Sequence, residues 1–252
     1  MNIGLIRDIL KGRDVKNMVK IRLCDLLIEV RMKYKYTLDF LEDYITKDEG
    51  DVAFSVSVTE DELKSEAEKE PKFPLPYHET LCLYRKICNE ISRHNCFMMH
   101  SSVVVHEGVA FVFTAKSGTG KTTHSRLWLK NFPGSFIING DKPLFCYTDD
   151  GFYVYGTPWC GKEGYNKNTS AKVSSLCFIE RGSENSIRQI SVREVLSKIF
   201  EQLYIPKDKE CGEKVLALLD KFLSTIPSYV LSCNISDEAA LLAEKVMNKR
   251  KD

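Results

Sequence analysis

The residues best suited to chemistry lie in one stretch, residues 113–128, which reads FTAKSGTGKTTHSRLW. This stretch fits the phosphate-binding pattern G-x-x-x-x-G-K-[ST] except at its first position, where Ala115 stands in place of glycine. Glycines allow the unusual backbone angles such a loop needs, and a following helix adds the positive end of its dipole. We therefore expect the backbone N–H groups of residues 117–122 to surround phosphate oxygens. The single methyl group of Ala115, at the exit of the preceding strand, is a small addition.

The side chains of the loop have distinct expected roles. Lys121 is expected to reach the β- and γ-phosphates, and the Thr122 hydroxyl to ligate Mg²⁺. The alternative is an incidental lysine after a glycine turn, but the apolar strand before the loop and the helix after it are the context that the motif requires. The sequence thus predicts ATP and Mg²⁺ as ligands, with ATP against GTP left open. The predicted nucleotide-contacting residues are Ser117, Gly118, Thr119, Gly120, Lys121, Thr122 and Thr123.

A carboxylate follows at a spacing that suits a metal ion. Asp141 comes shortly after the apolar segment FIIN and lies twenty residues after Lys121. An acidic residue that leaves a neighbouring strand beside phosphates can hold Mg²⁺ directly or through water. Aspartate before Lys-Pro is, taken alone, more often a turn former. Next to a phosphate loop, the metal role is favoured.

These motifs resemble those of two related kinase families. SGTGKTT, followed by a buried strand and an aspartate, resembles the kinase motifs of phosphoenolpyruvate carboxykinase. The preceding segment MHSSVVVHEGVAFVFTA is more similar to HPr kinase/phosphorylase, because His100, Gly108 and the loop 115–122 match that family position by position. GTPWCGK at 156–162, with its following asparagines Asn166 and Asn168, resembles small bacterial HPr-kinase-like proteins. The resemblance covers roughly residues 95–182.

The resemblance implies an ATP-dependent kinase that phosphorylates a hydroxyl group on a protein, a peptide or a small molecule. A carboxykinase itself is not expected, because those enzymes are about twice as long as this chain. The alternative is a nucleotide-binding accessory or regulatory protein without transferase activity. The implied catalytic residues are His100, Asp141, Lys121, Lys162 and Glu163, and the implied metal ligands are Thr122 and Asp141.

One departure from the family bears on the chemistry. Both families carry paired aspartates where this chain has Gly140 and Asp141. In HPr kinases one acid serves the metal and the other lies near the attacking hydroxyl, so the loss affects transfer more than nucleotide binding. Glu163 is a candidate replacement, and Lys162 is a candidate to neutralise phosphate charge. The alternative for their loop is a surface segment pinned by its aromatic residues.

Three further residues each allow two interpretations. His100 either relays the proton of an acceptor or contacts the γ-phosphate, or it is a strand residue satisfied by a backbone partner. His124 is expected to be neutral and structural, because a charged imidazole in the first helical turn would oppose the dipole. Arg181 either clamps phosphates or is a solvated strand end.

Composition narrows the possible partners and location. The 252 residues include 36 basic and 35 acidic ones, so no net field attracts nucleic acid. No run of about eighteen apolar residues and no signal-peptide core is present, so we expect a cytoplasmic protein that does not enter a membrane. The nine cysteines lack C-x-x-C spacing and are interpreted as buried thiols rather than disulfides. Whether the chain forms a homo-oligomer is left open.

The expected fold is α/β, a P-loop domain of the HPr kinase and phosphoenolpyruvate carboxykinase type with a mixed sheet and hairpins. The proline-rich stretch KEPKFPLPYH predicts a boundary, which gives a small α+β segment at 1–75 and the P-loop domain at 76–252. Hairpins are expected with turns at His106–Gly108 and Asp150–Gly151. Helices are expected over 77–93, 121–130, 192–203 and 213–223, and a last helix over 237–249, capped by Asp237.

Overall fold

The structure is a computed structural model that describes residues 17–248. The chain divides into two compact units, Met1–Glu90 and Ile91–Asp252. The boundary expected near residue 75 coincides with the start of helix α4 (Leu75–Ile91), which belongs almost wholly to the first unit. The prolines do not interrupt this helix, because Pro76 occupies its first turn, where a backbone N–H has no helical partner.

The first unit is a small α+β fold built on a three-stranded sheet of order β1-β2-β3, in which β1 and β2 are antiparallel and β3 runs parallel to β2. The helix over Glu60–Lys69 begins with a capping box: the Thr59 side chain accepts from the amide of Glu62, and the Glu62 side chain accepts from the amide of Thr59. The elements of this unit are β1 (Asn17–Leu23), β2 (Leu26–Met32), α2 (Lys35–Leu41), a 3₁₀ turn (Glu42–Tyr44), β3 (Phe54–Ser57), α3 (Glu60–Lys69) and α4.

A buried carboxylate joins α4 to the segment after β2. Glu79 is fully buried, and it accepts hydrogen bonds from the amides of Lys33, at 2.7 Å, and Tyr34, at 3.3 Å, and from the hydroxyl of Thr37. Burial raises the pKa of Glu79, and these three hydrogen bonds oppose that shift. The carboxylate therefore satisfies three donors that would otherwise be buried without a partner.

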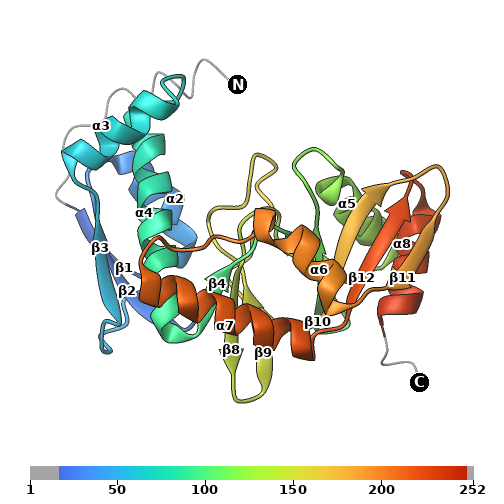
Figure 1. The fold of residues 1–252 in the computed structure, drawn as a ribbon. Helices are drawn as coiled ribbons and strands as arrows, with labels where there is room; N and C mark the ends of the chain where they lie inside the picture. Colours follow the sequence, from blue (N-terminus) through green and yellow to red (C-terminus); the bar gives the residue numbers. More distant parts are fainter. Residues whose placement is uncertain (1–16, 249–252) are drawn as a thin grey trace. The chain divides into compact units, whose positions relative to one another are not determined.

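The second unit carries a nine-stranded mixed sheet (Figure 1). Its elements are a 3₁₀ turn (Ser92–His94), β4 (Cys96–Met98), β5 (Ser102–His106), β6 (Val109–Thr114), α5 (Lys121–Asn131), β7 (Phe136–Asn139), β8 (Leu144–Thr148), β9 (Gly151–Tyr155), β10 (Ser170–Arg181), β11 (Ser186–Gln189), α6 (Val192–Ile199), a 3₁₀ turn (Phe200–Gln202), α7 (Lys209–Thr225), β12 (Ser228–Cys233) and α8 (Asp237–Met247). The expected mixed sheet with two hairpins is thus confirmed.

The sheet brings four strand ends to one edge. Strand β10 pairs in parallel with β6 on one side, and on its other side with β9 at its start and with β12, in parallel, at its end. Strand β5 is antiparallel to both β6 and β7. The carboxyl ends of β6, β7, β10 and β12 therefore lie at the same edge, which is where ligands bind in open α/β sheets.

Two apolar clusters cover the two faces of this sheet. On one face, Val112 and other strand residues pack against Phe222 of α7 and Ile199 of α6. On the other face, Phe113 packs with Trp128 of α5 and with Ala243 of α8. Figure 1 shows α6 and α7 in front of the sheet and α5 behind it. Because β6 alternates between the two faces, its exit loop is anchored from both sides.

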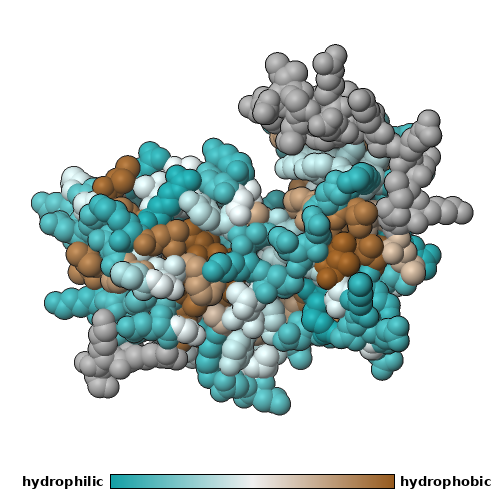
Figure 2. Space-filling model, turned by 180° about the vertical axis from the view of Figure 1, so that it is seen from behind, coloured by the Kyte–Doolittle hydropathy of each residue, from teal (hydrophilic) through white to brown (hydrophobic). Residues whose placement is uncertain are grey.

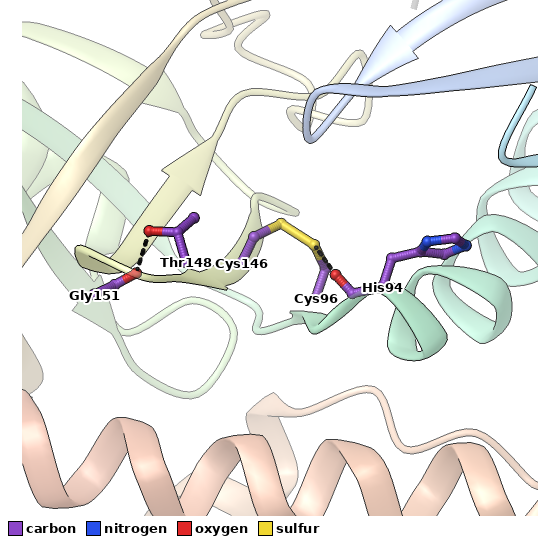
Figure 3. The surroundings of a disulfide bond; sticks show 5 residues. All are labelled: His94, Cys96, Cys146, Thr148 and Gly151. Carbon is purple, nitrogen blue, oxygen red and sulfur yellow. Dashed lines mark hydrogen bonds between the residues drawn. A yellow bond between two sulfur atoms is a disulfide. The ribbon is translucent and has the colours of Figure 1, made fainter. Parts of the chain in front are cut away.

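Two expectations about local structure are wrong. Helix α8 has Ser236 as its N-cap without a side-chain bond, and Asp237 is its first residue, whose carboxylate instead accepts from Lys130 and Asn131. Cys96 and Cys146 are not free thiols but form a disulfide with a Cα–Cα distance of 4.1 Å (Figure 3). They are direct partners in the β4–β8 ladder. Because they are fifty positions apart in the chain, no local sequence pattern predicts their pairing.

The surface is mostly hydrophilic on the side opposite to Figure 1, with exposed apolar side chains in separate patches (Figure 2). Within residues 17–248, no helix has the length and apolar character that crossing a bilayer requires. The seven other cysteines, all inside that range, carry free thiols.

The Glu79 cluster yields a stability prediction. Glu79→Leu keeps a similar volume but removes the acceptor of the buried Thr37 hydroxyl and of two part-buried amides; a buried donor left unsatisfied costs about 1–3 kcal/mol. We expect the free energy of unfolding, measured by urea denaturation, to fall by at least about 2 kcal/mol. Glu68→Leu, at an exposed position of α3, is the control and is expected to change it by less than about 0.5 kcal/mol. Equal effects of the two variants would contradict this account of Glu79.

Candidate functional site

The loop between β6 and α5 depends on glycine at two positions. Gly118 and Gly120 have positive φ values of 78° and 126°. A Cβ atom at either glycine would meet nothing within 4 Å, so conformation rather than space requires glycine there. Gly120 is the N-cap of α5, and Thr122 and Thr123 lie half-buried in its first turn. The first amides of a helix have no intrahelical acceptor and so are available to an anion.

Ala115 and Lys121 close the base of this loop. Ala115 is buried and packs in the cluster that contains Phe113 and Trp128. The Lys121 amine donates to the carbonyl oxygen of Ala115 at 2.9 Å. Burial lowers the pKa of Lys121, and the charge of Asp141 opposes that shift. Ala115, which departs from the glycine pattern, is therefore packed against the apolar core at the exit of β6.

Arg181, at the end of β10, holds the tip of the loop. Its guanidinium donates to the carbonyl oxygen of Gly118 at 2.6 Å and to that of Thr119 at 3.3 Å. The sequence left a phosphate clamp and a solvated strand end as alternatives, and the geometry shows a third role. Arg181 therefore fixes two carbonyls of the loop, and within the loop the Thr119 amide donates to the carbonyl oxygen of Lys116 at 3.2 Å.

His100 and Asp141 meet beside the loop. His100 Nε2 lies 2.7 Å from Asp141 Oδ1, and the two side chains are 29% and 28% exposed. Backbone bonds fix both residues: Gln202 accepts from the His100 amide at 2.7 Å, and Thr114, the last residue of β6, donates to the His100 carbonyl at 2.8 Å. The Ser101 amide donates to the Asp141 carbonyl at 3.1 Å. The pair is therefore built into the framework that carries the loop.

The charges around Asp141 keep it ionised. Burial alone would raise the pKa of Asp141, but the hydrogen bond and charge of His100, together with Lys142 and Lys121, hold it below its ordinary value. Lys142 Nζ lies 4.0 Å from Asp141 Oδ2. Asp141 is therefore a carboxylate at neutral pH, with Oδ1 directed to His100 and Oδ2 on the side of Lys142.

Asn139 organises this acid-bearing turn, although it was not among the residues predicted from the sequence. Its Oδ1 accepts from the amides of Asp141 at 2.9 Å and Lys142 at 2.8 Å. Its Nδ2 donates to the carbonyl oxygen of Thr157 at 2.9 Å. Asn139 is fully buried, so it fixes the direction of the Asp141 backbone and ties it to the loop after β9. The signal in the sequence was Asn-Gly-Asp directly after an apolar strand.

The loop 156–165 packs directly on Gly140 and Asp141. A Cβ atom on Gly140 would lie 2.9 Å from the carbonyl oxygen of Cys160, and the Gly140 amide donates to Tyr165 at 2.9 Å. A Cβ atom on Gly161 would lie 3.2 Å from Cβ of Asp141. Backbone atoms of this loop therefore occupy the space that a side chain at residue 140 would need.

Lys162 and Glu163 do not contact the His100–Asp141 pair. Lys162 is exposed, and Glu163 lies near Arg126. The pKa of Arg126 is raised mainly by the hydrogen bond to Tyr165 and to a lesser degree by Glu163. In the described part of the chain, neither Lys162 nor Glu163 forms a hydrogen bond or ion pair with His100 or Asp141.

His124 is the neutral structural residue that the sequence predicts. It is 2% exposed, and its Nε2 accepts from the indole of Trp128 at 3.0 Å. Burial lowers the pKa of His124 to about 4, so its imidazole is uncharged at neutral pH. The expectation of a neutral His124 is confirmed.

Two cavities adjoin the loop. One of about 670 Å³ is lined by the loop from Ala115 to Thr119, with Lys198 and Gln202 on its far wall. The other, of about 500 Å³, is lined by Gly118–Gly120, by α5 and by the segment that follows β12. Both volumes are in the range of small-molecule sites.

Comparison with known proteins finds a distant structural likeness and no match in sequence. No protein-family profile and no curated protein matches the sequence. Among solved structures, the chain is similar to the HPr(Ser) kinase/phosphatase from Coxiella burnetii, with 9% identity, coverage of 61% of this chain and 90% of that chain, and a TM-score of 0.38. At this identity and TM-score the likeness decides no function, which has to be inferred from the geometry of the site.

The packing around Gly140 yields a second prediction. Gly140→Ala places a methyl group against the backbone oxygen of Cys160, and overpacking of this kind costs about 1–3 kcal/mol. We expect a melting temperature clearly below that of the native chain, measured by circular dichroism. Gly50→Ala is the control, because its Cβ would meet only the Asp48 side chain, at 3.2 Å. A Gly140→Ala variant as stable as the native chain would show that loop 156–165 does not pack against Gly140. If Gly140→Ala is destabilised, the larger side chain of Gly140→Asp cannot be used to place a second carboxylate next to Asp141.

Proposed function

We propose that this protein binds Mg²⁺ and a nucleoside triphosphate at residues 117–123 and transfers the γ-phosphate to a hydroxyl group of a protein, peptide or small molecule. The observation that supports this most is the placement of His100 and Asp141, hydrogen-bonded to each other at 2.7 Å, beside the glycine loop. Burial lowers the pKa of Lys121, the lysine of that loop, and the charge of Asp141 opposes this shift. Such a site contains a phosphate cradle, a carboxylate and a base in one framework.

The residues divide the work of binding and transfer. The amides of the loop and the ammonium of Lys121 would hold the phosphates, which is the main requirement of phosphoryl transfer. The Thr122 hydroxyl and Asp141 Oδ2 are the oxygen donors suited to Mg²⁺, whose charge would neutralise the phosphate oxygens. The oxygen-only chemistry of this donor set fits magnesium.

The proton of the acceptor hydroxyl needs a destination. Because Asp141 Oδ1 accepts from His100 Nε2, the carboxylate favours the tautomer in which Nδ1 is free to take a proton. As the hydroxyl oxygen bonds to the γ-phosphorus and the bond to the β-phosphate oxygen breaks, the hydroxyl proton would pass to His100 Nδ1. Asp141 would then stabilise the imidazolium.

A second candidate is a nucleotide-binding partner without transferase activity. The observation that favours it is the close packing at Gly140, which leaves the site with one acid where the resembled kinases have two. Asp141 is then shared between His100 and any metal. Both candidates require nucleotide binding, and they differ in transfer.

Nucleotide binding is tested with Lys121→Ala. Mg²⁺–ATP is expected to raise the melting temperature of the native chain, because a ligand that binds only the folded state stabilises it. Lys121→Ala is expected to lose most of that shift, with at least a tenfold weaker Kd by calorimetry. Lys116→Ala, an exposed loop lysine whose partner is Glu201, serves as the matched control. An unchanged native melting curve at millimolar Mg²⁺–ATP would refute both candidates.

Transfer is tested with Asp141→Asn, which keeps the shape but removes the charge. We expect at least a hundredfold loss of label transfer from γ-labelled ATP to acceptors in a cell lysate, and weaker ATP binding with Mg²⁺ than in the native chain. Asp149→Asn, an exposed carboxylate in the β8–β9 turn, is expected to behave as native. ATP binding without any transfer by the native chain would favour the binding partner over the kinase.

A further inference from the structure

The Cys96–Cys146 disulfide lies at one end of a ribbon whose other end carries the His100–Asp141 pair. Cys96 is the first residue of β4, and His100 follows two residues after that strand ends. Asp141 lies three residues before β8, the strand that contains Cys146. The two strands are antiparallel, and the disulfide joins directly opposite residues (Figure 3). The two segments meet again where the Ser101 amide donates to the Asp141 carbonyl oxygen at 3.1 Å.

The rest of this ribbon is held by a short ladder. Among the described strands, β4 is at the end of the sheet path and pairs with β8 over three residue pairs. Just beyond the disulfide, the Tyr147 amide donates to the carbonyl oxygen of Asn95 at 2.9 Å. On its other side, the segment with β4 bonds to residues 202–204, which hold it against the chain after α6 rather than against Asp141. The disulfide is therefore the covalent link across the ribbon.

Side-chain packing by itself allows more than one register of β4 on β8. Phe97 is buried and packs on Phe145 with 5.5 Å between the ring centroids. Met99, two residues later, is also buried, so a slip of two residues would again place a large apolar side chain on the core face. Because a strand rises about 3.3 Å per residue, this slip would move His100 by about 6–7 Å, out of hydrogen-bond reach of Asp141. A covalent link between opposite residues prevents it.

We propose that Cys96 and Cys146 are positioning residues for the His100–Asp141 pair, and that opening their disulfide lowers phosphoryl transfer. The inference rests on the proposed function and adds a redox-sensitive control of the same site. A dithiol reductant supplies two electrons and two protons: the Sγ–Sγ bond breaks, each sulfur becomes a thiol, and the reductant closes to its own disulfide. The glycine loop lies between β6 and α5, outside the ribbon. Reduction is therefore expected to affect the pair more than the loop.

Amide hydrogen exchange, followed by NMR, measures the ribbon without an acceptor substrate. The Ser101 amide reports the bond to Asp141, and the amide of the buried Val104, in β5, reports the neighbouring part of the sheet. Reduction with dithiothreitol is expected to speed exchange at Ser101 at least tenfold and at Val104 less than twofold. The double variant Cys96→Ser, Cys146→Ser is expected to show the same two changes without reductant.

A matched control removes a different thiol. Cys233 is a half-buried free cysteine of β12. Cys233→Ser is expected to exchange like the native chain at Ser101 before reduction and to respond to dithiothreitol as the native chain does.

Transfer of label from γ-labelled ATP separates positioning from binding. The rate at saturating Mg²⁺–ATP is expected to fall at least fivefold when the native chain is reduced, and to recover when glutathione disulfide restores the bond. The affinity for ATP without Mg²⁺ is expected to change less than twofold. The double variant is expected to transfer at the reduced rate and to respond to neither reagent.

The contrary outcomes are distinct. Free thiols at Cys96 and Cys146 in the oxidised chain, found by alkylation and mass spectrometry, overturn the proposal, and so does a reduced chain with native exchange at Ser101 or native transfer. Equal acceleration at Ser101 and Val104 also overturns it, because the disulfide would then act only on global stability. If the native chain neither binds Mg²⁺–ATP nor transfers label, the proposed function fails, whereas the exchange results still decide whether the disulfide positions the pair.

Discussion

The hydrogen bond between His100 and Asp141 is the interaction on which the candidate site depends. It joins the residue that precedes β5 to the residue that follows β7, at the edge where β6 enters the glycine loop. Hydrogen bonds fix the backbone that carries both side chains. Thr114 and Gln202 bind the His100 backbone, and Asn139 binds the Asp141 amide. Preorganisation of this kind is what a transfer site requires, since charge stabilisation is effective only when the dipoles are already in place.

Electrostatics and packing act together around this pair. Lys121 is buried beside Asp141, and each makes the charged form of the other less unfavourable. Backbone atoms of loop 156–165 pack against Gly140 and leave no room for a side chain at residue 140. The packing of this loop therefore leaves Asp141 as the acid that follows β7. Arg181 completes the arrangement by holding the loop carbonyls.

Local signals in the sequence predicted the elements well. The glycines of the 115–122 loop and of the turns at Gly108 and Gly151 act through short-range backbone conformation, so the two hairpins and α5 appear close to where they were expected. What escaped prediction is long-range. The Cys96–Cys146 pairing follows from the register of β4 on β8 (Figure 3), and the contacts of Arg181 follow from the parallel pairing of β10 with β6. No local pattern encodes either pairing.

The central claim is that a nucleoside triphosphate lies along the loop with its γ-phosphate at the His100–Asp141 pair. A crystal structure of the chain with Mg²⁺ and a non-hydrolysable ATP analogue tests this most directly. The account predicts phosphates on the amides of residues 117–122, with the γ-phosphate beside His100 and Asp141 and with the oxygens of Thr122 and Asp141 available to hold Mg²⁺. A nucleotide bound elsewhere, or one that runs along the loop with its base beside His100, would contradict it.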